Sequence, residues 1–473
     1  MSNQPGASNV SKTNDDRPNV LILTMHDLGT RLGCYGYDSV NSPNLDALAG
    51  GGVRFTRSFA TAPFCSPSRG AMYTGKYTHV NGLMGNVNLG WELPASNTTI
   101  AKALGKAGYE TFLLGYQHEA SEERIPDLGF GSADMAGGRC RKVAPRVAGF
   151  LEARAGNPAP FYLRTGFFEV HRPFDQGYEP EDPAKVSLPG WLADTPAARE
   201  DLSHYDGCVR DMDAGVGTIL DALEESGLAE NTLVIFTTDH GSPFPRAKGT
   251  LYDAGINTSL LVRWPRGFKG SRVLDEMIGN VDLCPTVLEA AGAEIPDDIQ
   301  GRSFLPLLQE REYAERTEVF AEANVHATDP KRAIRTGRHK LIHNLLPGPA
   351  ILLADSEGSL TRRDYGNDHL RPRPEFELYD LLEDPTERVN LAGREEHQAV
   401  QRELTERLRR IREETADPAL NGPIPRPPVE REILDGAVSK VEERSAYSRE
   451  GLLNAHFESY RDDWEFAPLP ESR

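Results

Sequence analysis

Long apolar runs are missing from this chain of 473 residues. No stretch approaches the roughly 20 consecutive apolar residues that a membrane-spanning helix needs. The leader, residues 1–17, is polar and has no apolar segment of the kind found in signal peptides. We therefore expect no membrane partner, a disordered leader and a cytoplasmic protein.

Basic residues are also scarce. The chain has 52 lysines and arginines against 71 acidic residues, for a net charge of −19. Such a surface repels nucleic acid and anionic membranes, so we expect neither as a partner. An anionic substrate would need a locally basic pocket.

Cysteine is rare and scattered. The five cysteines, at positions 34, 65, 140, 208 and 284, are odd in number and include no Cys-x-x-Cys pair. This pattern is a poor disulfide framework and offers no paired-cysteine metal site. It favours a reducing compartment.

The chain is long enough to bury a large core. Continuous apolar runs at 19–25 and 231–238 are typical of strands buried on both faces. Further strands at 110–115 and 161–168 alternate with amphipathic helices such as 197–227. This alternation predicts an α/β fold with a doubly wound, mostly parallel sheet flanked by helices.

The composition changes near residue 296, where charges increase and short β-like pieces begin. We expect a catalytic α/β domain over 18–295 and a smaller C-terminal α+β domain over 296–420. Residues 421–473 form an extension rich in proline and charge, in which we find no chemistry.

The most informative stretch is Cys65–Gly75, Cys-Ser-Pro-Ser-Arg-Gly-Ala-Met-Tyr-Thr-Gly. Pro67 fits the start of a helix, whose free N–H groups would face an anion. Arg69 offers a forked donor to a tetrahedral oxyanion or a metal-bound oxygen. Taken one at a time, Cys65 could equally be a buried structural thiol and Arg69 a solvated side chain.

Taken whole, this stretch resembles the signature of the type I sulfatases of the alkaline phosphatase superfamily. In that family, Cys-x-Pro-Ser-Arg followed by Thr-Gly directs a formylglycine-generating enzyme to oxidise the cysteine. The resemblance implies that Cys65 becomes formylglycine, whose hydrate is the nucleophile. One oxygen of the hydrate attacks sulfur, and deprotonation of the other expels sulfate.

Polar groups follow the two most apolar strands, as His26-Asp27-Leu28-Gly29 and Asp239-His240-Gly241. The carboxyl ends of parallel strands are where open α/β sheets bind ligands. The family has Asp-Asp-x-Gly and Asp-Asn-Gly at these places. The resemblance therefore implies a divalent metal held by Asp27, Asp239 and the modified Cys65, with His26 and His240 as further ligands.

By resemblance we name calcium as the first candidate metal. The two imidazoles favour manganese or zinc, and magnesium also stays open. The alternative for each aspartate is a loop or capping carboxylate. For His26 it is a histidine that hydrogen-bonds a ligand.

The family's Gly-Lys-x-His is Gly115-Tyr116-Gln117-His118 here. His118 would remove the second proton of the hydrate, and Tyr116 would contact the substrate. His171 and Lys248 match the family's anion-binding positions and would assist the leaving group. The alternative for His118 and His171 is a structural role, and the alternative for Lys248 is a solvated side chain.

More basic side chains occur later in the chain. We expect His326 to bind substrate at the mouth of the pocket. A basic stretch would lie beside it or form a solvated face; its members are Arg335, Arg338, His339, Lys340 and His343. Lys76 and His79 could orient the residues around Cys65.

The resemblance covers residues 18–415, and 191–199 looks most like the N-sulfoglucosamine sulfohydrolase branch, which cleaves a sulfamate. We therefore predict a sulfatase acting on a sulfate ester or sulfamate of a small anion such as a sulfated sugar. Two alternatives are a phosphonate monoester hydrolase or phosphodiesterase with the same site, and an inactive sulfate-ligand binding protein with unmodified Cys65. Homo-oligomer formation stays open.

Overall fold

The computed structural model describes residues 17–428, apart from 175–176, 325–329, 352, 354–355, 357 and 425. The main sheet of this part has nine strands in the order β4-β3-β5-β1-β6-β7-β2-β8, with β9 beside β2. Their bounds are β1 Asn19–Met25, β2 Val53–Phe59, β3 Glu110–Gly115, β4 Ser132–Asp134, β5 Phe161–Gly166, β6 Thr232–Thr238, β7 Asn257–Arg263, β8 Arg272–Leu274 and β9 Ile278–Gly279.

Strand β1 lies at the centre of this sheet. It pairs in parallel with β5 and β6, so that Val20 lies between Tyr162 and Leu233. Strand β7 runs antiparallel between β6 and β2. The reason is the connection from β6, which contains only the short helix α7 (Asp253–Ile256) and so no long crossover helix.

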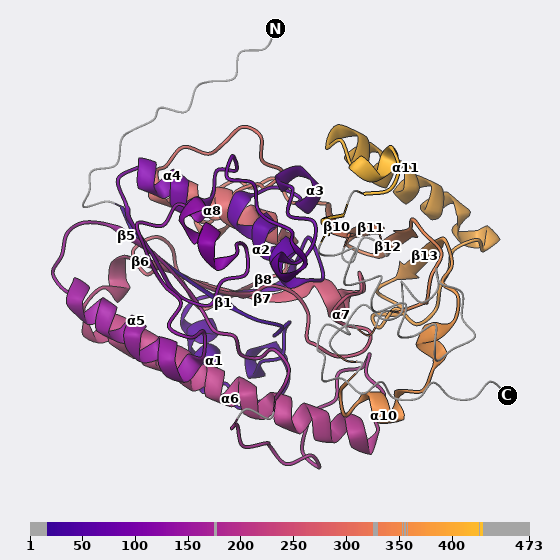
Figure 1. Ribbon diagram of the computed structural model, residues 1–473, viewed down its shortest axis with the longest axis horizontal. Coiled ribbons are helices and arrows are strands. Elements are labelled where there is room, and N and C mark those ends of the chain that lie inside the picture. Colours follow the sequence, from indigo (N-terminus) through magenta and orange to yellow (C-terminus); the bar gives the residue numbers. More distant parts are fainter. Residues whose placement is uncertain are drawn as a thin grey trace, which may run out of the picture.

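Helices cover both faces of the sheet (Figure 1). On one face lie α1 (Pro43–Gly51), α5 (Cys140–Arg154) and α6 (Pro196–Glu225), and on the other α2 (Cys65–Thr74), α4 (Ile100–Lys106) and α8 (Leu283–Ala291). Leu21 and Leu23 of β1 pack in the first core, and Val20 and Ile22 in the second. Burial on both faces explains why the run is apolar throughout. The predicted doubly wound, mostly parallel fold is confirmed.

A separate antiparallel sheet follows in the order β10-β11-β12-β13. Its strands are β10 Glu318–Ala323, β11 Lys331–Thr336, β12 His339–Asn344 and β13 Phe376–Asp380. Helix α11 (Gln398–Glu414) packs Leu404 and Leu408 against it. The expected domain boundaries stay predictions, and residues 1–16 and 429–473 lie outside the described part.

The remaining helices of the described chain are short: α3 Thr78–Asn81, α9 Leu305–Leu308 and α10 Arg362–Tyr365. The long helix predicted at 197–227 is α6, which Thr195 caps by accepting a hydrogen bond from the N–H of Ala198 at 3.1 Å. Among the described helices, none combines the length and the apolar character needed to cross a bilayer.

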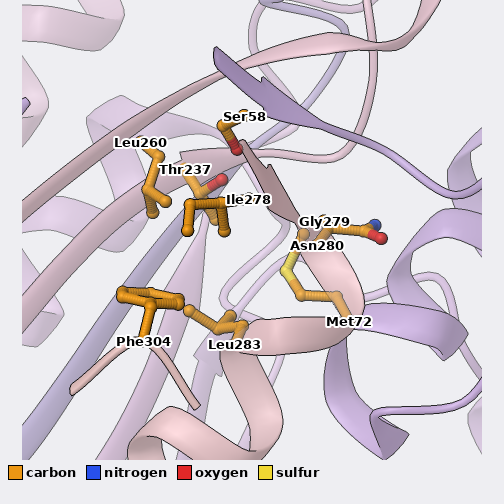
Figure 2. A pocket seen from close by; sticks show the side chains of 9 residues that line it. All are labelled: Ser58, Met72, Thr237, Leu260, Ile278, Gly279, Asn280, Leu283 and Phe304. Atoms are coloured by element: carbon orange, nitrogen blue, oxygen red, sulfur yellow. The ribbon is translucent and has the colours of Figure 1, made fainter. Parts of the chain in front are cut away.

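Close packing around Met72 holds helix α2 in place. Figure 2 shows Met72 of this helix beside Gly279, Asn280 and Leu283, around a void of about 10 Å³. The Asn280 side chain also donates to the backbone oxygen and hydroxyl of Ser68 at 3.1 and 2.9 Å. A void that holds at most about one water leaves the helix little freedom to shift. Met72 is three residues after Arg69 and seven after Cys65, so all three lie on one side of α2, and Cys65 and Arg69 belong to the site described next.

Candidate active site and metal centre

Cys65 is the first residue of α2 and is buried. Pro67 is the third residue, inside the first turn, where its fixed φ fits and its missing N–H costs nothing. The free N–H groups predicted for this helix start are partly used, because the N–H of Ser66 lies 3.4 Å from the side-chain oxygen of Asn86. The thiol therefore sits at a fixed, enclosed helix start.

Five potential metal ligands meet beside this thiol. One ligand atom from each of five residues lies within 4.8 Å of all the others: His26, Asp27, Cys65, Asp239 and His240. We call this group the metal cluster. Met25 and Thr238 are paired in the sheet, so the adjacent ends of β1 and β6 bring the two motifs together. All five residues are buried.

The contacts within the metal cluster are short. His26 Nδ1 lies 2.7 Å from Asp27 Oδ1 and 3.4 Å from Asp239 Oδ2. His240 Nε2 lies 3.1 Å from Asp27 Oδ1 and 3.5 Å from Cys65 Sγ. Carboxylate, imidazole and thiolate donors gathered in this way fit a divalent cation.

Two cations border the cluster. Lys248 Nζ donates to Asp27 Oδ2 at 2.9 Å and lies 3.3 Å from His171 Nε2. Arg69 Nε donates to Asp239 Oδ2 at 3.0 Å. Arg69 therefore holds a carboxylate of the metal cluster, which agrees with the second of its two expected partners, an oxygen that binds the metal.

These charges shift the protonation of the buried groups. Burial alone would lower the pKa of His26, but the negative charges of Cys65, Asp239 and Asp27 raise it to about 9. Burial alone would raise the pKa of Cys65, but His26 and Lys248 hold it well below its ordinary value. The site therefore favours a thiolate and charged carboxylates, which are the forms that bind metals.

Aromatic and imidazole rings line the side of the cluster next to β3 and β5. Tyr116 and His118 follow β3, and their ring centres lie 5.1 and 6.2 Å from that of His26. His171 follows β5, with its ring 4.5 Å from His26. The Nδ1 atom of His118 is buried without a hydrogen-bond partner in the described structure, and a hydrogen bond from the His118 side chain helps to lower the pKa of Cys65.

The other predicted residues lie in different surroundings. His326 falls outside the described residues. The basic stretch pairs with acidic side chains: Arg335 and Lys340 with Asp253, Arg338 and His339 with Asp380, and His343 with Glu375. Lys76 pairs with Asp298 and His79 with Glu322. These contacts favour a structural role over a place at the mouth of the pocket.

Sequence reasoning missed two residues that support the site. The hydroxyl of Tyr205, on α6, donates to the backbone oxygen of Asp27 at 2.8 Å. The ring of Phe168 packs against both His26 and His171, with ring centres 5.7 and 4.9 Å away. Phe168 lies in the Phe-Glu-Val-His segment after β5, so its closeness to His171 in the sequence could have indicated a place near the site. Tyr205 carries no local signal beyond helical spacing.

The comparisons with known proteins agree with this geometry. The sulfatase family model matches residues 18–293, and a model for the C-terminal part of N-sulphoglucosamine sulphohydrolase matches residues 246–355. N-sulphoglucosamine sulphohydrolase of Homo sapiens is 30% identical, covering 86% of this chain and 92% of that protein.

Two solved structures share the fold. One, in complex with its substrate D-glucosamine-2-N,6-O-disulfate, has a TM-score of 0.67 at 22% identity, covering 86% of this chain and 99% of the other. The other, the phosphonate monoester hydrolase of Agrobacterium radiobacter, has a TM-score of 0.64 at 22% identity, covering 84% and 96%. The extent of the family match and the identity to the human protein lead to one conclusion. This chain belongs to the sulfatase family, and it is a sulfuric ester hydrolase.

Proposed function

We propose that this protein hydrolyses a sulfate ester or sulfamate on a small sugar, with formylglycine made from Cys65 as its reactive group. The observation that carries the proposal is the place of Cys65, buried at the start of α2 with its sulfur 3.5 Å from His240 Nε2 in the metal cluster. A hydrated aldehyde at that atom would supply the nucleophile.

The sugar substrate is supported by the relatives. The human relative is named for a sulfated glucosamine, and one solved structure of the same fold holds a glucosamine disulfate. The match to the C-terminal model of N-sulphoglucosamine sulphohydrolase points the same way. We therefore place a sulfated sugar, with sulfate on nitrogen or oxygen, first among the substrates.

The residues around Cys65 would divide the work. A divalent metal held by the metal cluster, for which the family resemblance suggests calcium, would draw negative charge from the sulfate group. Lys248 and His171, 3.3 Å apart, would bind the sulfate oxygens and pass a proton to the leaving group. His118 would accept the proton of the hydrate, because its side chain interacts with that of Cys65. Arg69 would hold Asp239 in place, and Tyr116 would contact the substrate.

The proposal includes a maturation step and a location. A formylglycine-generating enzyme would oxidise the Cys65 thiol to the aldehyde, and we place both proteins in the cytoplasm. The acidic chain would then attract its anionic substrate only locally, through Lys248.

Mass spectrometry of the peptide that contains Cys65, together with turnover of sulfated glucosamines, tests this function. We expect formylglycine in protein from a host that makes the modifying enzyme, and turnover in proportion to it. Cys65→Ala should lower turnover on the order of 10⁶-fold while the fold is retained. Full activity in a preparation that contains only the thiol would contradict the mechanism, and would leave a binding or other role for Cys65.

A phosphonate monoester hydrolase is the second candidate. Two features favour it: the same fold is found in such an enzyme, and Asp239-His240-Gly241 resembles the variant motif of phosphonate monoester hydrolases. Comparing kcat/KM for p-nitrophenyl sulfate, phenylphosphonate monoester and phosphate monoester separates the candidates. We expect sulfate to be preferred and the dianionic phosphate to be slowest, because Tyr116 stands where the family has a lysine.

A further inference from the structure

The oxygen atoms of the metal cluster are largely committed to protein donors. Asp27 Oδ2 accepts from Lys248 at 2.9 Å, and Asp239 Oδ2 accepts from Arg69 at 3.0 Å. Asp239 Oδ1 accepts from the backbone N–H groups of Asp27 and His240, both at 2.9 Å. Of the four carboxylate oxygens, Asp27 Oδ1 is the one whose recorded partners in the described structure are imidazole nitrogens alone, those of His26 and His240.

This arrangement is poorly suited to calcium. Calcium takes six to eight oxygen ligands, usually from several carboxylates, carbonyls and waters. An oxygen that already accepts a hydrogen bond from lysine, arginine or the backbone has less electron density to offer a hard cation. In the buried cluster, one carboxylate oxygen has no lysine, arginine or backbone donor recorded against it. The site therefore offers calcium fewer oxygen ligands than the family resemblance implies.

The nitrogen and sulfur donors, in contrast, face one another. His240 Nδ1 lies 2.9 Å from the carbonyl oxygen of Gly241, which places the proton on Nδ1 and the lone pair on Nε2. That Nε2 lies 3.5 Å from Cys65 Sγ and 3.1 Å from Asp27 Oδ1. His26 Nδ1 lies 3.9 Å from the same sulfur. Two nitrogens, one sulfur and one oxygen make a typical donor set for zinc.

We propose that the unconverted chain, in which Cys65 is still a thiol, is a zinc site formed by His26, Asp27, Cys65 and His240, and that zinc displaces calcium there. Binding forms a zinc–sulfur bond to the Cys65 thiolate, and any proton on the ligating imidazole nitrogens passes to solvent. The inference deepens the proposed function, because it takes Cys65 as the residue that is later converted. Conversion of Cys65 would remove the sulfur ligand.

The test uses the full chain from a host without the modifying enzyme, with the thiol confirmed by mass. Calorimetric titration with zinc and, separately, with calcium should show one bound zinc per chain. The affinity for zinc should be at least about 100-fold above that for calcium. Cobalt as a spectroscopic probe should give a thiolate-to-metal charge-transfer band. Cys65→Ser should remove the band and weaken zinc binding by roughly 100-fold.

The double variant His26→Asp with His240→Asn is the matched control, because it restores the oxygen donors of the family motif. Its zinc-to-calcium affinity ratio should fall. Calcium binding as tight as zinc in the natural chain, or a cobalt complex without a sulfur band, would overturn the inference. Both readings come from the unmodified chain, so they decide even if the double variant misfolds. Hydrolysis by converted protein is measured separately, so either proposal can fail alone.

Discussion

Two regions of the molecule each bury a lysine against carboxylates, and they do so in different ways. Lys248 donates to Asp27 at the metal cluster and lies 3.3 Å from His171, whose side chain is 17% exposed. Lys340, on β12, lies between Asp253 at 2.6 Å and Glu387 at 2.8 Å.

The surroundings of the two ammonium groups explain the difference in role. Lys340 also donates to the backbone oxygen of Leu251 at 3.0 Å, and Arg335 adds a second cation at 3.1 Å from Asp253. Cations and carboxylates alternate there, so each positive charge is already paired and none is left to bind an incoming anion. Lys248 instead borders the metal cluster and lies beside His171, which is partly exposed. A buried charge inside a balanced ion network stabilises the fold, whereas one beside converging ligands is available for chemistry.

Removing Lys248 should have the largest effect in this comparison. Lys248→Met takes away a preorganised positive charge beside the sulfate, so we expect turnover of sulfated glucosamine to fall on the order of 100-fold or more. Steady-state kinetics on formylglycine-containing protein measures it. Lys248→Arg should recover part of the loss because it keeps the charge. Near-natural kinetics for Lys248→Met would place this lysine outside the reaction.

Removing Lys340 should affect stability instead. Lys340→Met leaves Glu387 buried without its cation and leaves Asp253 with Arg335 alone, and removing one partner of a buried ion pair typically costs about 3–5 kcal/mol of unfolding free energy. Chemical denaturation measures the change, and the turnover per folded molecule should stay the same. Lys185, which is 81% exposed, is the matched control, because Lys185→Met should change stability by less than about 0.5 kcal/mol. Equal effects of the two substitutions would contradict a balanced ion network around Lys340.

Much of the fold follows from simple patterns in the sequence. The apolar runs that became β1 and β6 identify the central strands, since only strands covered on both faces are apolar at every position. The antiparallel direction of β7 could not be read from its residues, because direction depends on the connection and leaves no periodic signal.

The candidate site was predictable to the extent that its residues follow strands. Parallel strand ends bring His26 and Asp27 beside Asp239 and His240, and this proximity is what the motif argument predicts. Their roles in metal binding and catalysis stay predictions. The partners of Arg69 and the position of Tyr205 depend on contacts between elements that are far apart in the sequence, and local sequence patterns do not predict such contacts.

The smallest expected effect concerns acid stability and a third buried pair, His79 with Glu322. His79 Nδ1 lies 2.9 Å from Glu322 Oε1, between α3 and β10. Burial alone would raise the pKa of Glu322, but His79 and Arg332 hold it well below its ordinary value of 4.5. The unfolded chain therefore binds this proton more readily than the folded one. The stability that Glu322 contributes is fully present above pH 4.5 and is lost as pH falls through the lower pKa of the folded state.

Thermal unfolding of the natural chain and of Glu322→Gln, between about pH 6 and pH 3, measures this contribution. The natural chain should be the more stable at the upper end, and the difference should shrink as the solution becomes more acidic. Glu318→Gln is a suitable control because that carboxylate, on the same strand, is part exposed at 27%. Its pair with Arg407 is more open to solvent, so its contribution should be smaller. A stability difference for Glu322→Gln that does not vary with pH would mean that the lost contact, and not the charge of Glu322, carries the effect.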